Sequence, residues 1–237
     1  MCGLIGFTRN VKVCQLDENE VAEKMCAAIT HRGPDSEGIW WDESAPLVLG
    51  HRRLSILDPS PAGHQPMLSA CRRYVIAFNG EIYNHLALRE QLAQKGEAPN
   101  WRGHSDTETL LACFVAWGLE ETFQASVGMF AIAIWDKQEQ VLTLARDRMG
   151  EKPLYWGWCD DVLVFGSELK ALKAHPAFNA ENDRNALTLL LRHCYIPAPY
   201  SIYKGIQKLL PGHFGSAFPW AAPLRQPKAL NQWPTGE

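Results

Sequence analysis

The stretch MFAIAIWDKQEQVLTLA at residues 129–145 contains two runs rich in aliphatic, β-branched and aromatic residues. The polar segment 136–140 separates the two runs, so we expect them to form an antiparallel hairpin. Other strand-like runs lie at 1–7, 47–49, 74–78 and 162–165, and helical patterns lie at 17–30, 84–95, 105–118, 167–174 and 183–193. Because strands cluster as hairpins and helices form separate blocks, an α+β fold with antiparallel sheets covered by helices is favoured over a doubly wound parallel sheet.

The bulk composition is that of an ordinary globular protein. The 237 residues are 46% hydrophobic and 21% charged, and the net charge of −3 gives no electrostatic reason to expect nucleic acid or an anionic membrane as partner. The seven cysteines are odd in number and show no CxxC spacing, which argues against a disulfide framework and a metal site. No signal peptide or apolar run of membrane-spanning length is visible, so we expect a cytoplasmic protein.

The C-terminal segment differs in character from the rest of the chain. Prolines at 219, 223, 227 and 234 interrupt every helical or strand-like pattern there. We therefore predict one domain over residues 2–213 and an irregular Pro-rich tail over 214–237.

Cys2 occupies an unusual position for a thiol. Removal of Met1 leaves a thiol and a free α-amine on one residue, and such an amine has a reference pKa of about 7.7–8.0. The amine is then able to accept the thiol proton, so that one residue supplies both nucleophile and base. The alternative is a small apolar residue at the start of a buried strand.

Four further residues match the needs of an acyl-transfer site. The amide of Asn79 and the backbone N–H of Gly80 follow a strand and could face a developing oxyanion, although an Asn-Gly turn is the simpler alternative. A carboxylate is the natural ligand of Arg53, which otherwise is a surface residue at a strand end. Asp106, within the capping-box pattern of residues 105–108, is either a first-turn acid or the partner of a ligand ammonium. Together these groups complement an amino acid with a side-chain amide, and glutamine is the obvious candidate.

Seven motifs, in register along residues 2–213, resemble a known family. They are MCGLIGF, HRGPD, GHRRLSILD, FNGEIYN, SDTE, ARDRMGEKPLY and FGSELKAL. This order resembles the glutaminase domain, a class II glutamine amidotransferase, of glutamine-hydrolysing asparagine synthetase. The resemblance implies a four-layer αββα N-terminal nucleophile hydrolase sandwich of two antiparallel sheets.

The resemblance also implies a role for each site residue. By motif position, Cys2 is the nucleophile and Asn79 and Gly80 form the oxyanion hole. Arg53 is expected to hold the glutamine carboxylate, while Glu81 and Asp106 receive its ammonium. The site is expected to be lined through backbone contacts by Leu54, Ser55, Ile56 and Leu57.

The expected function is hydrolysis of L-glutamine to L-glutamate and ammonia through a Cys2 glutamyl thioester, as the amidotransferase part of an asparagine synthetase. No SGGxDS loop occurs in the sequence, so we expect the synthetase domain to be absent, with ATP and magnesium belonging to that domain. A synthetase domain or subunit acting in trans is the expected partner. The sequence leaves open whether the chain forms a homodimer. Two alternatives are a glutaminase part that serves amidation of surface-polysaccharide sugars, and an inactive truncated remnant.

Overall fold

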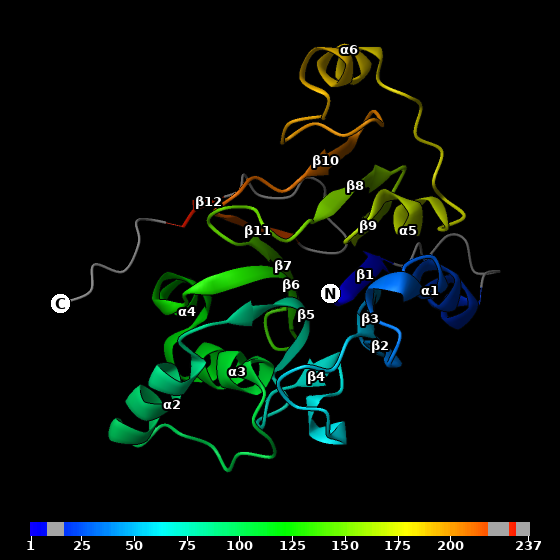
Figure 1. Ribbon diagram of the computed structural model, residues 1–237. Coiled ribbons are helices and arrows are strands. Elements are labelled where there is room, and N and C mark those ends of the chain that lie inside the picture. Colours follow the sequence, from blue (N-terminus) through cyan, green and yellow to red (C-terminus); the bar gives the residue numbers. More distant parts are fainter. Residues whose placement is uncertain (9–16, 218–227, 231–237) are drawn as a thin grey trace.

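The computed structural model describes residues 1–8, 17–217 and 228–230, whose strands form two sheets (Figure 1). The strands of the first sheet are β1 (Gly3–Thr8), β2 (Ser36–Trp41), β3 (Leu47–Arg53), β8 (Tyr155–Cys159), β9 (Val162–Gly166) and β10 (Ile206–Lys208). Those of the second sheet are β4 (Met67–Leu68), β5 (Tyr74–Ile82), β6 (Gly128–Asp136), β7 (Val141–Arg146), β11 (His213–Ala217) and β12 (Lys228–Ala229). The helices are α1 (Glu18–Ala27), α2 (His85–Gln94), α3 (Asp106–Trp117), α4 (Leu119–Ala125), α5 (Leu169–Lys173) and α6 (Arg184–His193).

Both sheets are antiparallel. The first has the strand order β10-β8-β9-β1-β3-β2, and the second has the order β12-β11-β7-β6-β5-β4. Strand β1 therefore lies inside the first sheet, between β9 and β3, and β5 lies between β6 and the short β4. These two strands bring the N-terminus and the segment after Phe78 to the same region of the molecule (Figure 1).

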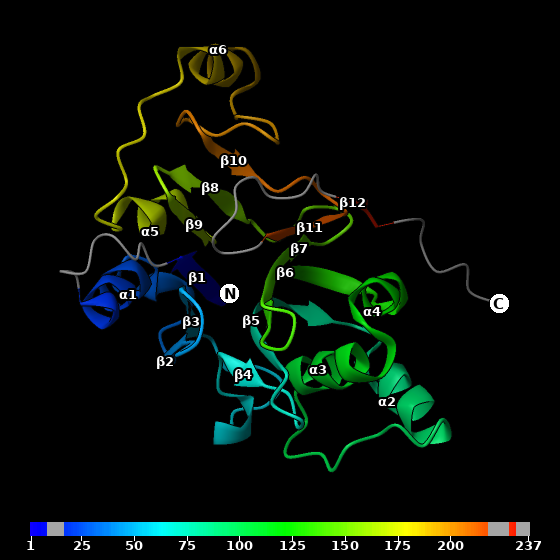
Figure 2. The same cartoon turned by 180° about the vertical axis from the view of Figure 1, so that it is seen from behind.

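The core consists of three layers of buried side chains. One layer lies between the sheets and includes Leu4, Leu144 and Phe165. A second packs α2, α3 and α4 on the outer face of the second sheet, and a third packs α1 and α5 on the outer face of the first sheet (Figure 2). This αββα arrangement confirms the α+β class expected from the sequence.

The hairpin of residues 129–145 is confirmed as β6 and β7. Along β6, Ile132 and Ile134 pack in the layer under the helices, whereas Ala133 and Trp135 pack between the two sheets. Successive side chains thus point to opposite faces, and both faces are buried. This double burial explains why the run is apolar throughout instead of alternating with polar residues.

The helix starts agree with the sequence, but several other elements differ. Asp17 and Ser105 cap α1 and α3, because their side chains accept hydrogen bonds from the N–H groups of Asn19 and Glu108. Helix α1 ends earlier than expected, at Ala27. Strands β2, β4, β8 and β10 and helix α4 had no counterpart in the sequence analysis. No helix in the described parts of the chain is long and apolar enough to cross a bilayer.

The expectation of an irregular tail over 214–237 is wrong for the part that the structure describes. Strand β11 crosses the proposed boundary at residue 213 and pairs with β7 from Phe214 to Ala217, and β12 adds a short pairing to it. The reason is tertiary: an open edge of β7 provides backbone partners that a local pattern does not reveal. Residues 218–227 and 231–237 of the predicted tail lie outside the described residues.

Cys194 at the end of α6 has a left-handed backbone conformation, with φ 61° and ψ 10°. Glycine takes this conformation without the steric cost that a Cβ brings. We expect Cys194→Gly to stabilise the fold by about 1 kcal/mol, which corresponds to a rise in melting temperature of about 2–4 °C. Cys194→Ala removes the thiol but keeps the Cβ, so it should give no such rise; equal gains in both variants would contradict this explanation.

Candidate active site

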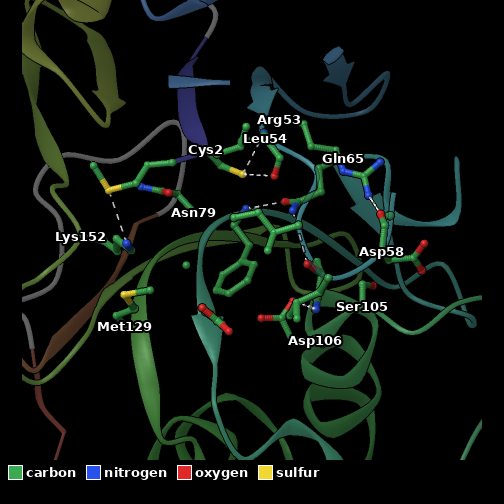
Figure 3. Close-up of a pocket in the computed structure, with 18 residues that line it drawn as sticks. Cys2, Arg53, Leu54, Asp58, Gln65, Asn79, Ser105, Asp106, Met129 and Lys152 are labelled. Atoms are coloured by element: carbon green, nitrogen blue, oxygen red, sulfur yellow. Dashed lines mark hydrogen bonds between the residues drawn. The ribbon is translucent and has the colours of Figure 1, made fainter. Parts of the chain in front are cut away.

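Cys2 directly precedes β1 and lines a pocket to which strands of both sheets contribute residues (Figure 3). The backbone N–H of Leu54 donates a hydrogen bond to the Cys2 Sγ at 3.3 Å, and the Sγ lies 3.5 Å from the Leu54 carbonyl oxygen. Burial raises the pKa of the thiol, and the Leu54 contact offsets only part of this effect. The thiol is therefore protonated at neutral pH and needs a base to become a nucleophile.

The backbone of Cys2 is anchored by a charged network on the HRGPD segment. Arg32 Nε donates to the Cys2 carbonyl oxygen at 2.9 Å, and Arg32 Nη1 pairs with Glu168 at 2.9 Å. Although burial acts in the opposite direction, hydrogen bonds from Arg32 and His31 lower the pKa of Glu168 to about 2. Glu168 is thus ionised at neutral pH and holds the Arg32 guanidinium in place, and Arg32 in turn holds the backbone of Cys2.

Residues from both sheets and from the start of α3 line the pocket (Figure 3). Most of the site residues expected from the sequence are among them: Cys2, Arg53, Leu54, Ile56, Leu57, Asn79, Gly80, Glu81 and Asp106. The structure therefore brings together one thiol, one guanidinium, two carboxylates and one side-chain amide from segments far apart in the sequence.

Ser55 is the exception among the expected residues. It does not line this pocket but faces the neighbouring cleft formed with Pro59, Pro61 and His64. Its backbone N–H donates to the Asp35 carboxylate at 2.8 Å. The structure therefore does not place Ser55 in the pocket that holds Cys2, and its contact with the substrate stays a prediction.

Asn79 presents an unused donor to the pocket. The residue is 1% exposed, and its side-chain nitrogen has no hydrogen-bond partner among the described residues. A buried N–H group without a partner costs about 1–3 kcal/mol, so proteins seldom keep one without a function. A developing oxyanion in the pocket would supply the missing acceptor.

The backbone N–H of Gly80 lies on the same edge of β5 as the N–H groups of Phe78 and Ile82. On β5, the N–H of Phe78 binds the Gln65 side chain and the N–H of Ile82 binds Asp106, both on the edge away from β6. Because alternate N–H groups of a strand share an edge, the N–H of Gly80 lies between them on that edge. A Cβ at Gly80 would lie 2.2 Å from the Met129 carbonyl oxygen, so only glycine allows the close approach of β5 and β6.

Asp106 is the first residue of α3 and is only 5% exposed. Its two carboxylate oxygens accept from the N–H groups of Ile82 at 2.9 Å and Thr107 at 2.8 Å. Burial raises the pKa of Asp106 to about 6, and these two hydrogen bonds act in the opposite direction. A carboxylate held this way attracts a ligand ammonium strongly, because the surroundings are poor in water.

Arg53 ends β3 and organises the loop that follows it. Its guanidinium donates to the carbonyl oxygens of Asp58 and of Ser60, the latter at 3.0 Å. The close approach to this loop requires Gly63, where a Cβ would lie 2.0 Å from the guanidinium. These bonds use two of the five N–H donors of arginine, so the others stay available for a carboxylate in the pocket.

Among the pocket residues that the sequence did not indicate as site candidates are Gln65, Met129 and Lys152. Lys152 lies inside the motif ARDRMGEKPLY, and its Nζ is 3.5 Å from the Met1 sulfur (Figure 3). Gln65 and Met129 carry no charge or reactive group, and therefore only their tertiary position identifies them. Among the described residues, no group of three or more His, Cys, Asp or Glu side chains is arranged to hold a metal ion.

Known proteins resemble this chain over most of its length. A family model described as a glutamine amidotransferase domain matches residues 1–222. Asparagine synthetase [glutamine-hydrolyzing] 1 of Bacillus subtilis is 40% identical over 90% of this chain, and asparagine synthetase B of Escherichia coli is 37% identical over 73% of it. The matches cover 33% and 30% of those relatives, so the chain spans about one third of their length.

A solved structure gives independent support for the fold. The glutamine phosphoribosylpyrophosphate amidotransferase of Bacillus subtilis superposes with a TM-score of 0.67 and 18% sequence identity. The superposition covers 91% of this chain and 47% of that enzyme. The N-terminal nucleophile hydrolase sandwich expected from the sequence is thereby confirmed as the fold.

Proposed function

Because the chain belongs to the family of glutamine amidotransferase domains, we propose that it hydrolyses L-glutamine to L-glutamate and ammonia, with Cys2 as the nucleophile. The observation that carries this proposal is the unpartnered, buried Asn79 amide in the pocket that holds the Cys2 thiol. A nucleophile next to unused donors is what stabilisation of a tetrahedral oxyanion requires. An inactive remnant would have no need to retain a buried donor without a partner.

The base in this proposal is the α-amine of Cys2. Met1 is 59% exposed, so an aminopeptidase is able to reach it. Its removal converts the backbone nitrogen of Cys2 from a non-basic amide into an amine with a reference pKa of about 7.7–8.0. The amine takes the thiol proton, directly or through one water, which overcomes the raised pKa of the buried thiol.

The reaction then has two stages. The Cys2 sulfur forms a bond to the γ-amide carbon, and the carbonyl oxygen becomes an oxyanion held by the Asn79 amide and the Gly80 N–H. The α-ammonium passes its proton to the amide nitrogen, the C–N bond breaks, and ammonia leaves. Water, activated by the free amine, then attacks the thioester. Glutamate is released, and the Cys2 thiol is regenerated.

The remaining pocket residues hold the amino-acid end of glutamine. The guanidinium of Arg53 receives the α-carboxylate, and Asp106 and Glu81 receive the α-ammonium. Leu54, Ile56 and Leu57 line the same pocket, where their backbone groups contact the substrate in this proposal. The test is glutamate and ammonia release from glutamine without ATP: equal yields of both products support the proposal, and no release from a chain lacking Met1 overturns it.

We further propose that the released ammonia serves asparagine synthesis, because the relatives quoted above are named asparagine synthetases. The acceptor chemistry then resides in a synthetase part, joined to this chain or acting in trans. The cysteines of the described residues are all free, which fits a reducing compartment such as the cytoplasm. Glutamine-dependent asparagine formation after addition of a synthetase polypeptide, ATP and magnesium tests this assignment, and transfer to a sugar carboxylate instead would overturn it.

The raised pKa of Asp106 predicts a specific pH dependence. Below about pH 6 the Asp106 carboxyl is protonated and neutral, so it no longer attracts the glutamine ammonium. We therefore expect kcat/KM to fall twice as the pH decreases, once as the α-amine becomes protonated and again through about pH 6. In Asp106→Asn, kcat/KM should be lower at neutral pH and the second fall should be absent; a variant with an unchanged profile would contradict the role of Asp106.

A further inference from the structure

The cavity edge of β5 is held by side chains, not by a neighbouring strand. Strand β4 pairs with β5 only at Val75 and Ile76. Further along this edge, the N–H of Phe78 binds the Gln65 side chain, and the N–H of Ile82 binds the Asp106 carboxylate. The N–H of Gly80 lies between these two fixed points.

Gln65 makes the shorter of these two contacts. Its Oε1 accepts from the Phe78 N–H at 2.7 Å, and its Nε2 lies 3.4 Å from the Thr107 hydroxyl on α3. The residue is 6% exposed and lines the same pocket as Cys2 (Figure 3). Gln65 therefore links the oxyanion-binding edge of β5 to the helix that carries Asp106.

The carbonyl group of Phe78 is fixed by a second side chain. His51 is fully buried, and its Nε2 lies 2.9 Å from the Phe78 carbonyl oxygen. Burial lowers the pKa of His51 to about 3, so the ring is neutral and donates its Nε2–H to this carbonyl. Both backbone polar groups of Phe78, the residue before Asn79, are thus held by side chains from other segments.

We propose that Gln65 is a positioning residue for the oxyanion hole, an inference that rests on the glutaminase function proposed above. The donors of an oxyanion hole act only when they lie about 2.7–3.1 Å from the oxygen that becomes charged. Without a strand to fix this edge, the Gln65 acceptor at Phe78 sets where Asn79 and Gly80 present their N–H groups. The Gln65 side chain therefore contributes to stabilisation of the tetrahedral intermediate and not to binding of the amino-acid end of glutamine.

Two variants of similar size separate this role from simple filling of space. Gln65→Met removes the acceptor for the Phe78 N–H, whereas Gln65→Glu keeps it, and the Thr107 hydroxyl can donate to the new carboxylate. We expect Gln65→Met to lower kcat roughly 10- to 100-fold with KM changed by less than about threefold. Gln65→Glu keeps the acceptor but adds a negative charge near the oxyanion, so its kcat should lie between those of Gln65→Met and the wild type.

The deciding measurement compares two ligands in each variant: glutamate, and the γ-aldehyde analogue of glutamine. The Cys2 S–H adds across the aldehyde C=O, with a new S–C bond and the proton on oxygen or on the amine, and so forms a tetrahedral adduct. In Gln65→Met, the dissociation constant of the aldehyde should rise about as much as kcat/KM falls, while that of glutamate stays unchanged. Reversible unfolding would raise the apparent dissociation constants of the aldehyde and of glutamate by the same factor, so an unchanged value for glutamate separates the positioning role from loss of folded protein.

The outcomes distinguish the two proposals. An active wild type with equal aldehyde affinity in Gln65→Met, or with equal losses in Gln65→Met and Gln65→Glu, overturns the positioning role and leaves the glutaminase function standing. A weakened affinity for glutamate that matches the loss for the aldehyde shows general damage to the pocket and also overturns it. A wild type without glutaminase activity and without aldehyde binding overturns both.

Discussion

Cys2→Ala is expected to release no glutamate from glutamine above the uncatalysed background. The substitution removes the only atom in the proposal that forms a bond to the substrate, and the free α-amine alone cannot replace it. The pocket itself should survive, because Cys2 is a small residue and Arg32 holds its backbone carbonyl oxygen and not its side chain. The variant should therefore still bind glutamine, as measured by titration calorimetry.

Cys71→Ala is the matched control for this prediction. Cys71 is an exposed thiol in the turn between β4 and β5 and does not line the pocket with Cys2. Its removal should leave glutamate release within about twofold of the wild type, as expected for a surface substitution away from the site. Residual hydrolysis by Cys2→Ala at a rate comparable with Cys71→Ala would show that another group performs the attack.

Asn79→Ala is expected to lower kcat about 10²- to 10³-fold while KM changes little. This is the loss that follows removal of one side-chain donor from an oxyanion hole, and the Gly80 N–H accounts for the activity that remains. The Asn79 side-chain nitrogen has no partner in the described structure, so its removal breaks no hydrogen bond of the fold. The melting temperature should therefore change little, although most of the activity is lost. Thermal unfolding monitored by circular dichroism measures this.

Asn79→Asp provides a second test of the same donor. Aspartate has nearly the same shape but offers no N–H group when ionised, and its negative charge opposes an oxyanion. It should lose at least as much kcat as the alanine variant. A fall of less than about threefold in both variants would place the oxyanion elsewhere in the pocket.

The architecture was predictable where local patterns and burial agree. The hairpin of residues 129–145 was found because both of its strands are apolar throughout and only a short polar segment interrupts them. Strand β11 was missed because it depends on the open edge of β7 and lies next to several prolines. Short strands such as β10 pair over three residues, too few for an alternating pattern to be recognised.

The site was predictable where the residue type itself carries chemistry. Cys2, Asn79 and Asp106 have reactive or charged groups whose presence in known motifs indicated a role, and the pocket contains all three. Gln65 could not be found this way, because its significance is a hydrogen bond to the backbone of Phe78. Nor does the sequence show that Ser55 lies outside this pocket, with its N–H bound to Asp35.

The central claim is that the mature chain begins with Cys2 and that this residue attacks the γ-carbonyl of glutamine. The most direct test is the mass of the intact protein before and after incubation with a glutamine analogue that carries a diazo-ketone in place of the amide. We predict a mass that lacks Met1, followed by the addition of one analogue on the peptide starting at Cys2, with protection by glutamine. An active chain that retains Met1, or an analogue attached to any other cysteine with Cys2 unmodified, would contradict the claim.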